Sequence, residues 1–312
     1  MEDARHVLKA VEGVAVGRNL RKRVEMLQRI LQENIKDEPD GDVKEREYKE
    51  KPKDILVSPI DEDARYGCKS DTKRFMGYKA NVTESVEKKF ITNIQVTRGN
   101  RPDGEPTVGM VVEQKLNGLV PQKLIGDAAY ADGMNRKLLK DNATTMVAPL
   151  RETNSSAKKV YPKSMFHYDE KMATLTCPQG VKTKTCFEDH HHGLKQFHFP
   201  MSECRRCQVQ KECTNAEEGR RTVGISMFNQ ELREAEIYNA TEEFKKDMKL
   251  RPPIEGKLSE LTRYHGLRRA RYRGLVKVQL QSYFIAAAVN IKRWIKLILG
   301  GIAGQTEVAM GF

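Results

Sequence analysis

The sequence predicts an α/β protein with a mixed sheet flanked by helices, preceded by a helical arm and interrupted by a small cysteine-rich insertion. Three observations predict this fold class. Segments with strand and helix periodicity alternate between residues 55 and 150. Five of the six cysteines lie between Cys177 and Cys213, where long apolar periodicity is missing. Helical periodicity resumes at Gln230 and continues to residue 298.

These changes of pattern divide the chain into four parts. We expect a helical arm and charged linker over 1–54, the first part of the main α/β domain over 55–150, the cysteine-rich insertion over 151–222, and a helical second part of the main domain over 223–312. The linker, residues 36–54, is dense in charge and should bury almost nothing.

Within the main domain, short apolar runs rich in β-branched and aromatic residues predict strands, and apolar residues at helical spacing predict helices. The expected strands are 55–57, 75–82, 90–97, 123–127 and 145–149, with 75–82 and 90–97 forming a hairpin. The expected helices are 5–35 (one or two helices), 108–119, 134–141, 230–247, 253–265 and 274–298.

The 312-residue chain carries a formal net charge of +12, which attracts polyanions and makes nucleic acid the leading partner. The alternative is a basic protein with a positive solvated surface. No signal peptide is expected, because the chain opens with Met1, Glu2 and Asp3, and we expect a cytoplasmic protein. The apolar stretch 283–300 contains Lys292, Arg293 and Lys296, so no membrane span is expected.

Two acids sit where a metal-dependent phosphoryl transfer would need them. Asp127 ends a predicted strand, and Glu255 lies in the first turn of a predicted helix. Carboxylates on such rigid supports are natural ligands for Mg²⁺ or Mn²⁺. The alternatives are ordinary: an Asp after a strand is often a turn former or helix cap, and a Glu in a first helical turn often offsets the helix dipole.

Several motifs occur in one order along residues 55–296, and together they resemble the DDE transposases of bacterial insertion sequences, in the branch with a cysteine cluster between the second and third acids. The segments that carry the resemblance are SPIDEDAR (58–65), GYKA (77–80), IGDAAY (125–130), RPPIE (251–255), HGLRRARYRG (265–274) and AVNIKR (288–293).

The resemblance implies an RNase H-like catalytic domain, with Asp127 as the second acid and Glu255 as the third. It also implies Mg²⁺ or Mn²⁺ at the acids and a phosphate contact for Arg251. The chain departs from the related signature at Met248 and Thr262, where that signature has tyrosine and lysine, and Arg263 is a partial substitute.

The family's first acid lies upstream of a helical insertion, and this chain resembles a sequence that begins inside that insertion. We therefore expect an N-terminally truncated chain with an incomplete acid set. Asp61 is the best internal candidate for the missing ligand, and Asp63 is the second choice.

The cysteine cluster predicts a structural zinc site. Cys204 and Cys207 are close enough to chelate one ion, with Cys177 upstream and Cys213 downstream. The fourth ligand stays open, since Cys186, the run His190–His192 and His198 are also near. Reduced cysteines without metal are the alternative, and the histidine run is typical of a polar loop.

A basic segment follows Glu255, with arginines and lysine suited to phosphate oxygens and tyrosines suited to stacking. Its cations are Arg263, Arg268, Arg269, Arg271, Arg273 and Lys277, interleaved with Tyr264 and Tyr272. An exposed face with ordinary ion pairs is the alternative; with the resemblance, DNA contact is favoured.

The sequence therefore predicts a transposase, or its C-terminal part, that binds the terminal inverted repeats of a transposon and cuts and joins DNA strands. The partners expected are DNA, a second copy or an intact transposase, at the bacterial nucleoid. The main alternative is a catalytically inactive DNA-binding remnant that regulates an intact transposase, and a weaker one is a zinc-ribbon interaction protein without a DNA role.

Overall fold

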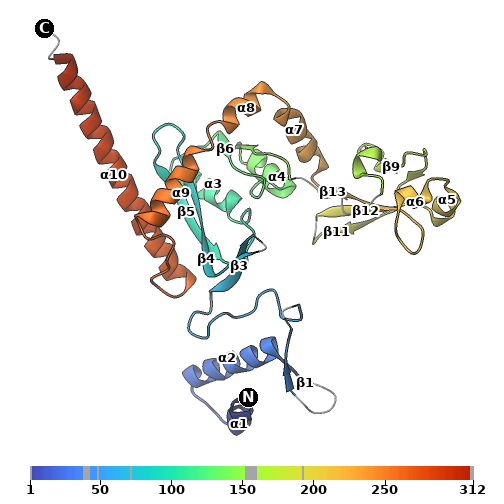
Figure 1. Cartoon of the computed structure of the whole chain (residues 1–312), viewed down its shortest axis with the longest axis horizontal. Helices are drawn as coiled ribbons and strands as arrows, with labels where there is room; N and C mark the ends of the chain where they lie inside the picture. Colours follow the sequence, from blue (N-terminus) through green and yellow to red (C-terminus); the bar gives the residue numbers. More distant parts are fainter. Residues whose placement is uncertain are drawn as a thin grey trace. The chain divides into compact units, whose positions relative to one another are not determined.

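The computed structural model describes residues 2–37, 43–47, 49–70, 72–151, 160–191 and 193–309. They form two compact units, Met1–Leu119 with Pro252–Phe312, and Val120–Arg251 (Figure 1). Helices and strands occur in both, which confirms the α/β class. No described helix carries an apolar stretch of the length and composition needed to cross a bilayer.

The first unit is built on an antiparallel sheet of three strands, β3 (Arg65–Ser70), β4 (Lys73–Glu84) and β5 (Ile91–Arg98), in that order. The expected hairpin is confirmed as β4 and β5, with Tyr78 opposite Arg98. Strand β3 replaces the strand expected at 55–57, where the structure has no strand and the backbone N–H of Leu56 bonds to Glu33 instead.

Three helices pack on this sheet: α3 (Thr107–Leu116), α9 (Pro253–Arg263) and α10 (Leu275–Ala309). Helix α10 runs along β5, where Val289 and Ala286 are buried with Ile91, Ile94 and Leu261 of α9 (Figure 1). Two side-chain amides of α10 also bond to the β5 backbone. Gln279 accepts the N–H of Val96 at 2.6 Å, and Asn290 accepts the N–H of Ile91 at 2.8 Å.

The arm of the first unit contains α1 (Glu2–Val11) and α2 (Arg18–Asn34), followed by a short antiparallel pair, β1 (Ile35–Asp37) and β2 (Val43–Glu45). This pair lies in the segment expected to be a solvated linker; residues 38–42 of that segment are outside the described part.

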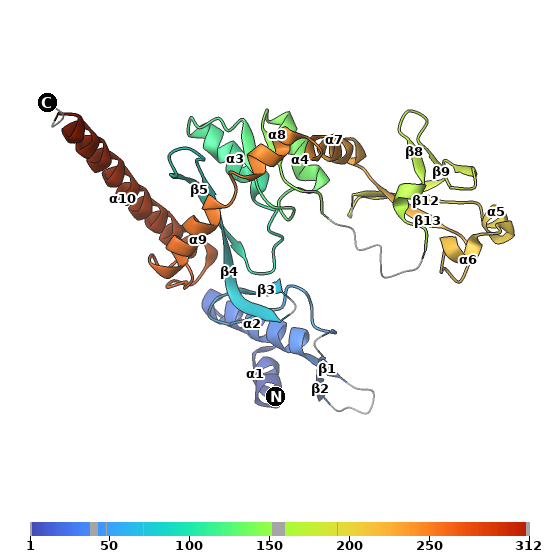
Figure 2. The ribbon, with the colours of Figure 1, turned by 45° about the horizontal axis from the view of Figure 1, so that its top comes forward.

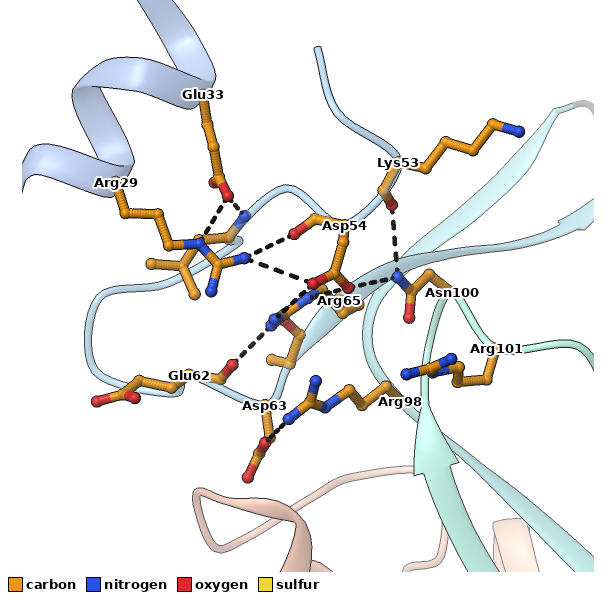
Figure 3. Close-up of polar contacts among 12 residues, drawn as sticks. Arg29, Glu33, Lys53, Asp54, Glu62, Asp63, Arg65, Arg98, Asn100 and Arg101 are labelled. Carbon is orange, nitrogen blue, oxygen red and sulfur yellow. Dashed lines mark hydrogen bonds and ion pairs between the residues drawn. The ribbon is translucent and has the colours of Figure 1, made fainter. Parts of the chain in front are cut away.

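A polar network ties the arm to the sheet (Figure 3). Arg65 is 1% exposed and donates from Nε to Asp54 at 2.8 Å, while Arg29 of α2 donates to the backbone carbonyl of Asp54 at 2.9 Å. Arg65 also donates to the carbonyls of Glu62 and Ala64. A buried arginine with this many acceptors fixes the start of β3 against the end of the linker.

The second unit contains a parallel pair, β6 (Lys123–Ile125) and β7 (Thr145–Val147), joined through α4 (Gly133–Asp141). Helix α7 (Asn229–Asn239) packs on α4, and α8 (Glu242–Met248) contacts β7. The single helix expected at 230–247 is thus broken, because Thr241 caps α8 by accepting the N–H of Phe244. The parallel and antiparallel pairs lie in separate sheets of different units, so one mixed RNase H-like sheet stays a prediction.

The cysteine-rich part of the second unit holds two three-stranded antiparallel sheets (Figure 2). One contains β8 (His167–Asp169), β9 (Thr174–Thr176) and β10 (Lys182–Thr183); the other contains β11 (Cys186–Asp189), β12 (Leu194–His198) and β13 (Thr222–Ser226). Short helices complete it: η2 (Lys163–Met165), α5 (Met201–Arg206) and α6 (Gln210–Cys213). Its apolar core is formed by Phe166, Leu175, Phe197, Phe199, Val223 and Ile225. None of these strands was predicted from the sequence, since most are too short to show periodicity.

Candidate functional site: two acids, a basic loop and a cysteine cavity

Asp127 stands in a turn just beyond β6. Its Oδ1 accepts the N–H of Ala129 at 2.8 Å, while the N–H of the preceding Gly126 continues the sheet by bonding to the carbonyl of Val147. The Asp127 side chain is 46% exposed. Asp127 therefore forms a turn, which was the alternative to a metal-ligand role, and its carboxylate remains accessible from solvent.

Arg251, expected to contact phosphate, faces this carboxylate. Its Nη2 lies 3.7 Å from Oδ2 of Asp127, with side chains 31% and 46% exposed. An ion pair of this length and exposure contributes little to stability. The pair shows that the RPPIE motif begins beside the IGDAAY motif within the second unit.

Glu255 lies in the first turn of α9, which begins at Pro253, and it is exposed. Proline in the first turn loses no helical hydrogen bond, so the sequence PPIE places the acid at the positive end of the helix. Glu255 belongs to the first unit and Asp127 to the second. Their meeting around shared ions therefore stays a prediction.

The predicted basic segment, here called the basic loop, runs from Arg263 at the end of α9 through the connecting loop to Lys277 in the first turn of α10. All of its predicted DNA-binding cations are exposed: Arg263, Arg268, Arg269, Arg271, Arg273 and Lys277. Tyr264 and Tyr272 are exposed as well. Among the described residues, no carboxylate forms an ion pair with any of these cations, so the alternative of a face with ordinary ion pairs does not describe this loop.

Two contacts to α10 hold the basic loop in shape. Gln281 accepts the N–H of Arg271 at 2.9 Å and donates to the carbonyl of Arg269 at 3.0 Å. These bonds fix the backbone between the arginines while leaving the guanidinium groups in solvent. Sequence reasoning missed Gln281, because a single glutamine in an amphipathic helix carries no local signal.

Asp61 and Asp63 anchor the end of the same loop. Oδ1 of Asp61 accepts the phenol of Tyr78 at 2.5 Å and the N–H of Gly274 at 3.1 Å. Asp63 accepts the N–H of Leu275 at 2.9 Å and a guanidinium N–H of Arg98 at 2.5 Å (Figure 3 shows the arginine contact). These contacts favour an anchoring role at the start of α10 over the metal-ligand role expected for Asp61.

The cysteine cluster closes around one cavity. Cys177, Cys204, Cys207 and Cys213 all line it, and its volume is about 40 Å³, more than the ~10–15 Å³ that one water needs. Neither Cys186 nor a histidine lines this cavity. Cys186 is exposed in β11, and His198 contacts the hydroxyl of Thr222 at 3.1 Å. The cavity thus favours Cys177 as the fourth member.

Arg221 supports this cluster and was missed by the sequence reasoning. It donates to the carbonyls of Cys213 and Tyr161, each at 2.8 Å, and its guanidinium lies 5.2 Å from the ring centre of Phe166. Burial raises the pKa of the Cys213 thiol, and the charge of Arg221 offsets part of that rise.

Metal binding by this cluster requires adjustment of its side chains. In the described residues, no three His, Cys, Asp or Glu side chains converge closely enough to hold a metal ion as they stand. The donor set nevertheless fits zinc chemically, because four thiols face one cavity. Of the histidine run, His190 lies 3.6 Å from Glu188, and His192 is outside the described residues.

Comparison with known proteins gives one family. Residues 176–295 match the model of the transposase DDE domain. This range includes the four cysteines of the cavity, Glu255, the basic loop and most of α10, whereas Asp61 and Asp127 lie outside it. No curated protein and no protein of solved structure matches the chain. Over residues 176–295 the match agrees with the resemblance to DDE-type transposases that the sequence motifs carry.

Proposed function

We propose that this chain is the catalytic part of a transposase that cleaves and joins DNA at transposon ends, with Asp127 and Glu255 as ligands of Mg²⁺ or Mn²⁺. The basic loop is the observation that carries the proposal. Its exposed cations lack carboxylate partners among the described residues, and it follows directly on α9, the helix whose first turn contains Glu255. Arginine forks of this kind hold phosphate oxygens.

The chemistry follows from the residue types. Divalent ions, when bound, would stabilise the attacking and leaving oxygens of an in-line displacement at phosphorus. The carboxylates of Asp127 and Glu255 would hold those ions. Arg251 would exchange its exposed contact with Asp127 for a phosphate oxygen, and the basic loop would hold the DNA backbone on the Glu255 side.

Strand cleavage tests this proposal. The full chain is incubated with duplex DNA that carries the terminal repeats, with Mg²⁺ or Mn²⁺ and with EDTA. We expect metal-dependent nicking that Asp127→Asn and Glu255→Gln each reduce by at least ~10³-fold. Asp141→Asn is the control, since Asp141 makes an exposed ion pair with Lys137 on α4. Cleavage that survives both acid substitutions contradicts the assignment.

A second candidate is favoured by the contacts of Asp61. Because Tyr78 and Gly274 already occupy its Oδ1, Asp61 is a poor candidate for the missing first acid. A chain with two acids would bind terminal repeats and regulate an intact transposase without cutting. Terminal-repeat binding without metal-dependent cleavage favours this candidate. An affinity that does not change with salt contradicts DNA binding in both candidates.

We also propose that the four cysteines of the cavity hold a structural Zn²⁺. The apolar core of this part is small, and a closed thiolate site would add stability without taking part in chemistry. Terminal inverted repeats as the DNA partner and a place at the bacterial nucleoid belong to the same proposal, because a transposase must reach chromosomal DNA.

A further inference from the structure

Helix α10 has two faces, and within the described residues of the first unit only one of them packs on other elements, β5 and α9. The side that meets the sheet contains Val278, Ser282, Ala286 and Val289, all buried. The opposite side is apolar and exposed: Leu280 is 53% exposed, Phe284 68%, Ile291 55%, Trp294 59% and Ile298 45%. Ala287 lies between them and is also exposed.

These exposed residues have the spacing of a two-helix seam. The positions 280, 284, 287, 291, 294 and 298 are separated by four, three, four, three and four residues, which is the a/d repeat of a coiled coil. The flanking positions are uncharged as well: Gln281, Tyr283, Ala288, Asn290, Ile295 and Leu297. The cations of this part of the helix, Lys292, Arg293 and Lys296, fall outside the seam and its flanks.

We propose that this seam is the interface between two copies of the chain, paired through α10. The exposed apolar side chains of the seam and its flanks amount to on the order of 800 Å² per copy, above the ~300–600 Å² of the largest patch on a typical monomer and close to the ~800 Å² that each partner contributes to a stable interface. The inference does not depend on the proposed function, since it uses only the geometry of α10.

The two helices run antiparallel. The seam is symmetric about residue 289, so a two-fold axis there places Leu280 opposite Ile298, Phe284 opposite Trp294, and Ala287 opposite Ile291. Each large ring then meets the partner's large ring, and the small Ala287 makes room for Ile291. This direction also opposes the helix dipoles and keeps Lys292, Arg293 and Lys296 of the two copies apart.

Trp294 reports on the interface directly, because it is the only tryptophan of the chain. We expect a dimer by sedimentation, with Trp294 emission that moves to shorter wavelength as the protein concentration rises through the dissociation constant. Ile291→Glu should weaken association at least ~100-fold, because it buries an unpaired charge in each half of the interface. Lys296→Glu, an exposed change on the same helix off the seam, should leave association within about threefold.

Direction is tested by mixing two variants. Phe284→Lys and Trp294→Glu should each be monomeric alone. In an antiparallel pair, residue 284 of one copy faces residue 294 of the other, so the mixture should form a heterodimer. Circular dichroism confirms that each variant is folded. A wild-type chain that stays monomeric, or a folded Ile291→Glu that dimerises like the wild type, overturns the interface; a mixture that stays monomeric overturns the antiparallel pairing.

Discussion

The phenol of Tyr78 in β4 donates a 2.5 Å hydrogen bond to Oδ1 of Asp61, the oxygen that also accepts the N–H of Gly274 at the start of α10. Asp61 therefore joins the sheet to the end of the basic loop. Burial of the Tyr78 phenol, together with its hydrogen bond to Asp61, raises the pKa of Tyr78. The phenol therefore stays a donor throughout the physiological range.

Tyr78→Phe tests this anchor. It removes one donor to a charged acceptor, and we expect a loss of ~1.5–3 kcal/mol in the free energy of unfolding. Asp61→Asn should cost a similar amount, and the double variant should cost less than the sum, because the two groups share one bond. Urea unfolding measures all three. If Asp61 were instead a metal ligand, Asp61→Asn would abolish cleavage while Tyr78→Phe would preserve it.

The buried guanidinium of Arg65 gives a second prediction. Arg65→Met should destabilise the first unit by ~2–4 kcal/mol, because the carbonyls of Glu62 and Ala64 lose their donor and Asp54 loses its partner. Lys53→Met is the control. Lys53 joins the network only through its backbone carbonyl, which accepts the bond from Asn100 and is unchanged by the substitution. A change below about 0.5 kcal/mol in urea unfolding would contradict the role given to Arg65.

Asp54 makes the stability of this network depend on pH. The hydrogen bond from Arg65 lowers the pKa of Asp54 from 3.8 to about 2. Since the folded pKa is depressed, the stabilisation is fully present above pH ~4 and is lost as the pH falls from ~4 through 2. The carboxyl is 54% exposed, so we expect only ~1 kcal/mol after solvent screening. Asp54→Asn should cost that amount at pH 7, and the difference should vanish near pH 2 in urea unfolding.

The basic loop predicts the salt dependence of DNA binding. Arg268→Ala and Arg271→Ala should each weaken duplex binding and each reduce the slope of log affinity against log salt by ~0.9. Lys123→Ala is the control, because Lys123 is already paired with Glu243 and Asp247 at 2.7 Å each. Fluorescence anisotropy between 50 and 200 mM salt measures the slope. Equal slopes for wild type and the arginine variants would exclude the loop from the interface.

The cysteine cavity predicts bound zinc. Purified chain should contain about one zinc ion, and Cys207→Ser should lower that content and the melting temperature of the second unit. Burial raises the pKa of Cys213, so metal binding must displace a proton there and should weaken as the pH falls. Cys186→Ser is the matched control, because Cys186 lies outside the cavity. Elemental analysis showing no zinc in either protein contradicts the site.

Sequence patterns predicted the helices and strands that are long enough to show a repeat of apolar residues. The hairpin of β4 and β5, helices α3 and α4, and the start of α9 after Pro252 all follow from such signals. Strand β3 was missed because its sequence, RYGCKS, is mostly polar, and its position depends on Arg65. The expected strand at 55–57 did not form because Leu56 bonds to Glu33, a partner 23 residues away.

The sequence predicted the residues of the candidate site, but it did not predict the residues that hold them in position. Asp127, Glu255 and the loop arginines are recognisable by motif and charge. Gln281, Arg221 and Tyr78 act through contacts that join residues 8 to 60 positions apart. Such contacts leave no periodic trace, so only the folded chain reveals them.

Cleavage of the protein backbone by bound iron tests the central claim most directly. Fe²⁺ replaces Mg²⁺ at carboxylate sites and, with peroxide and ascorbate, cuts the chain beside the ion. If Asp127 and Glu255 share ions, cuts should appear near both residues, and excess Mg²⁺, Asp127→Asn or Glu255→Gln should each suppress both. Cuts near residue 255 that persist undiminished in Asp127→Asn would show that the two carboxylates do not meet.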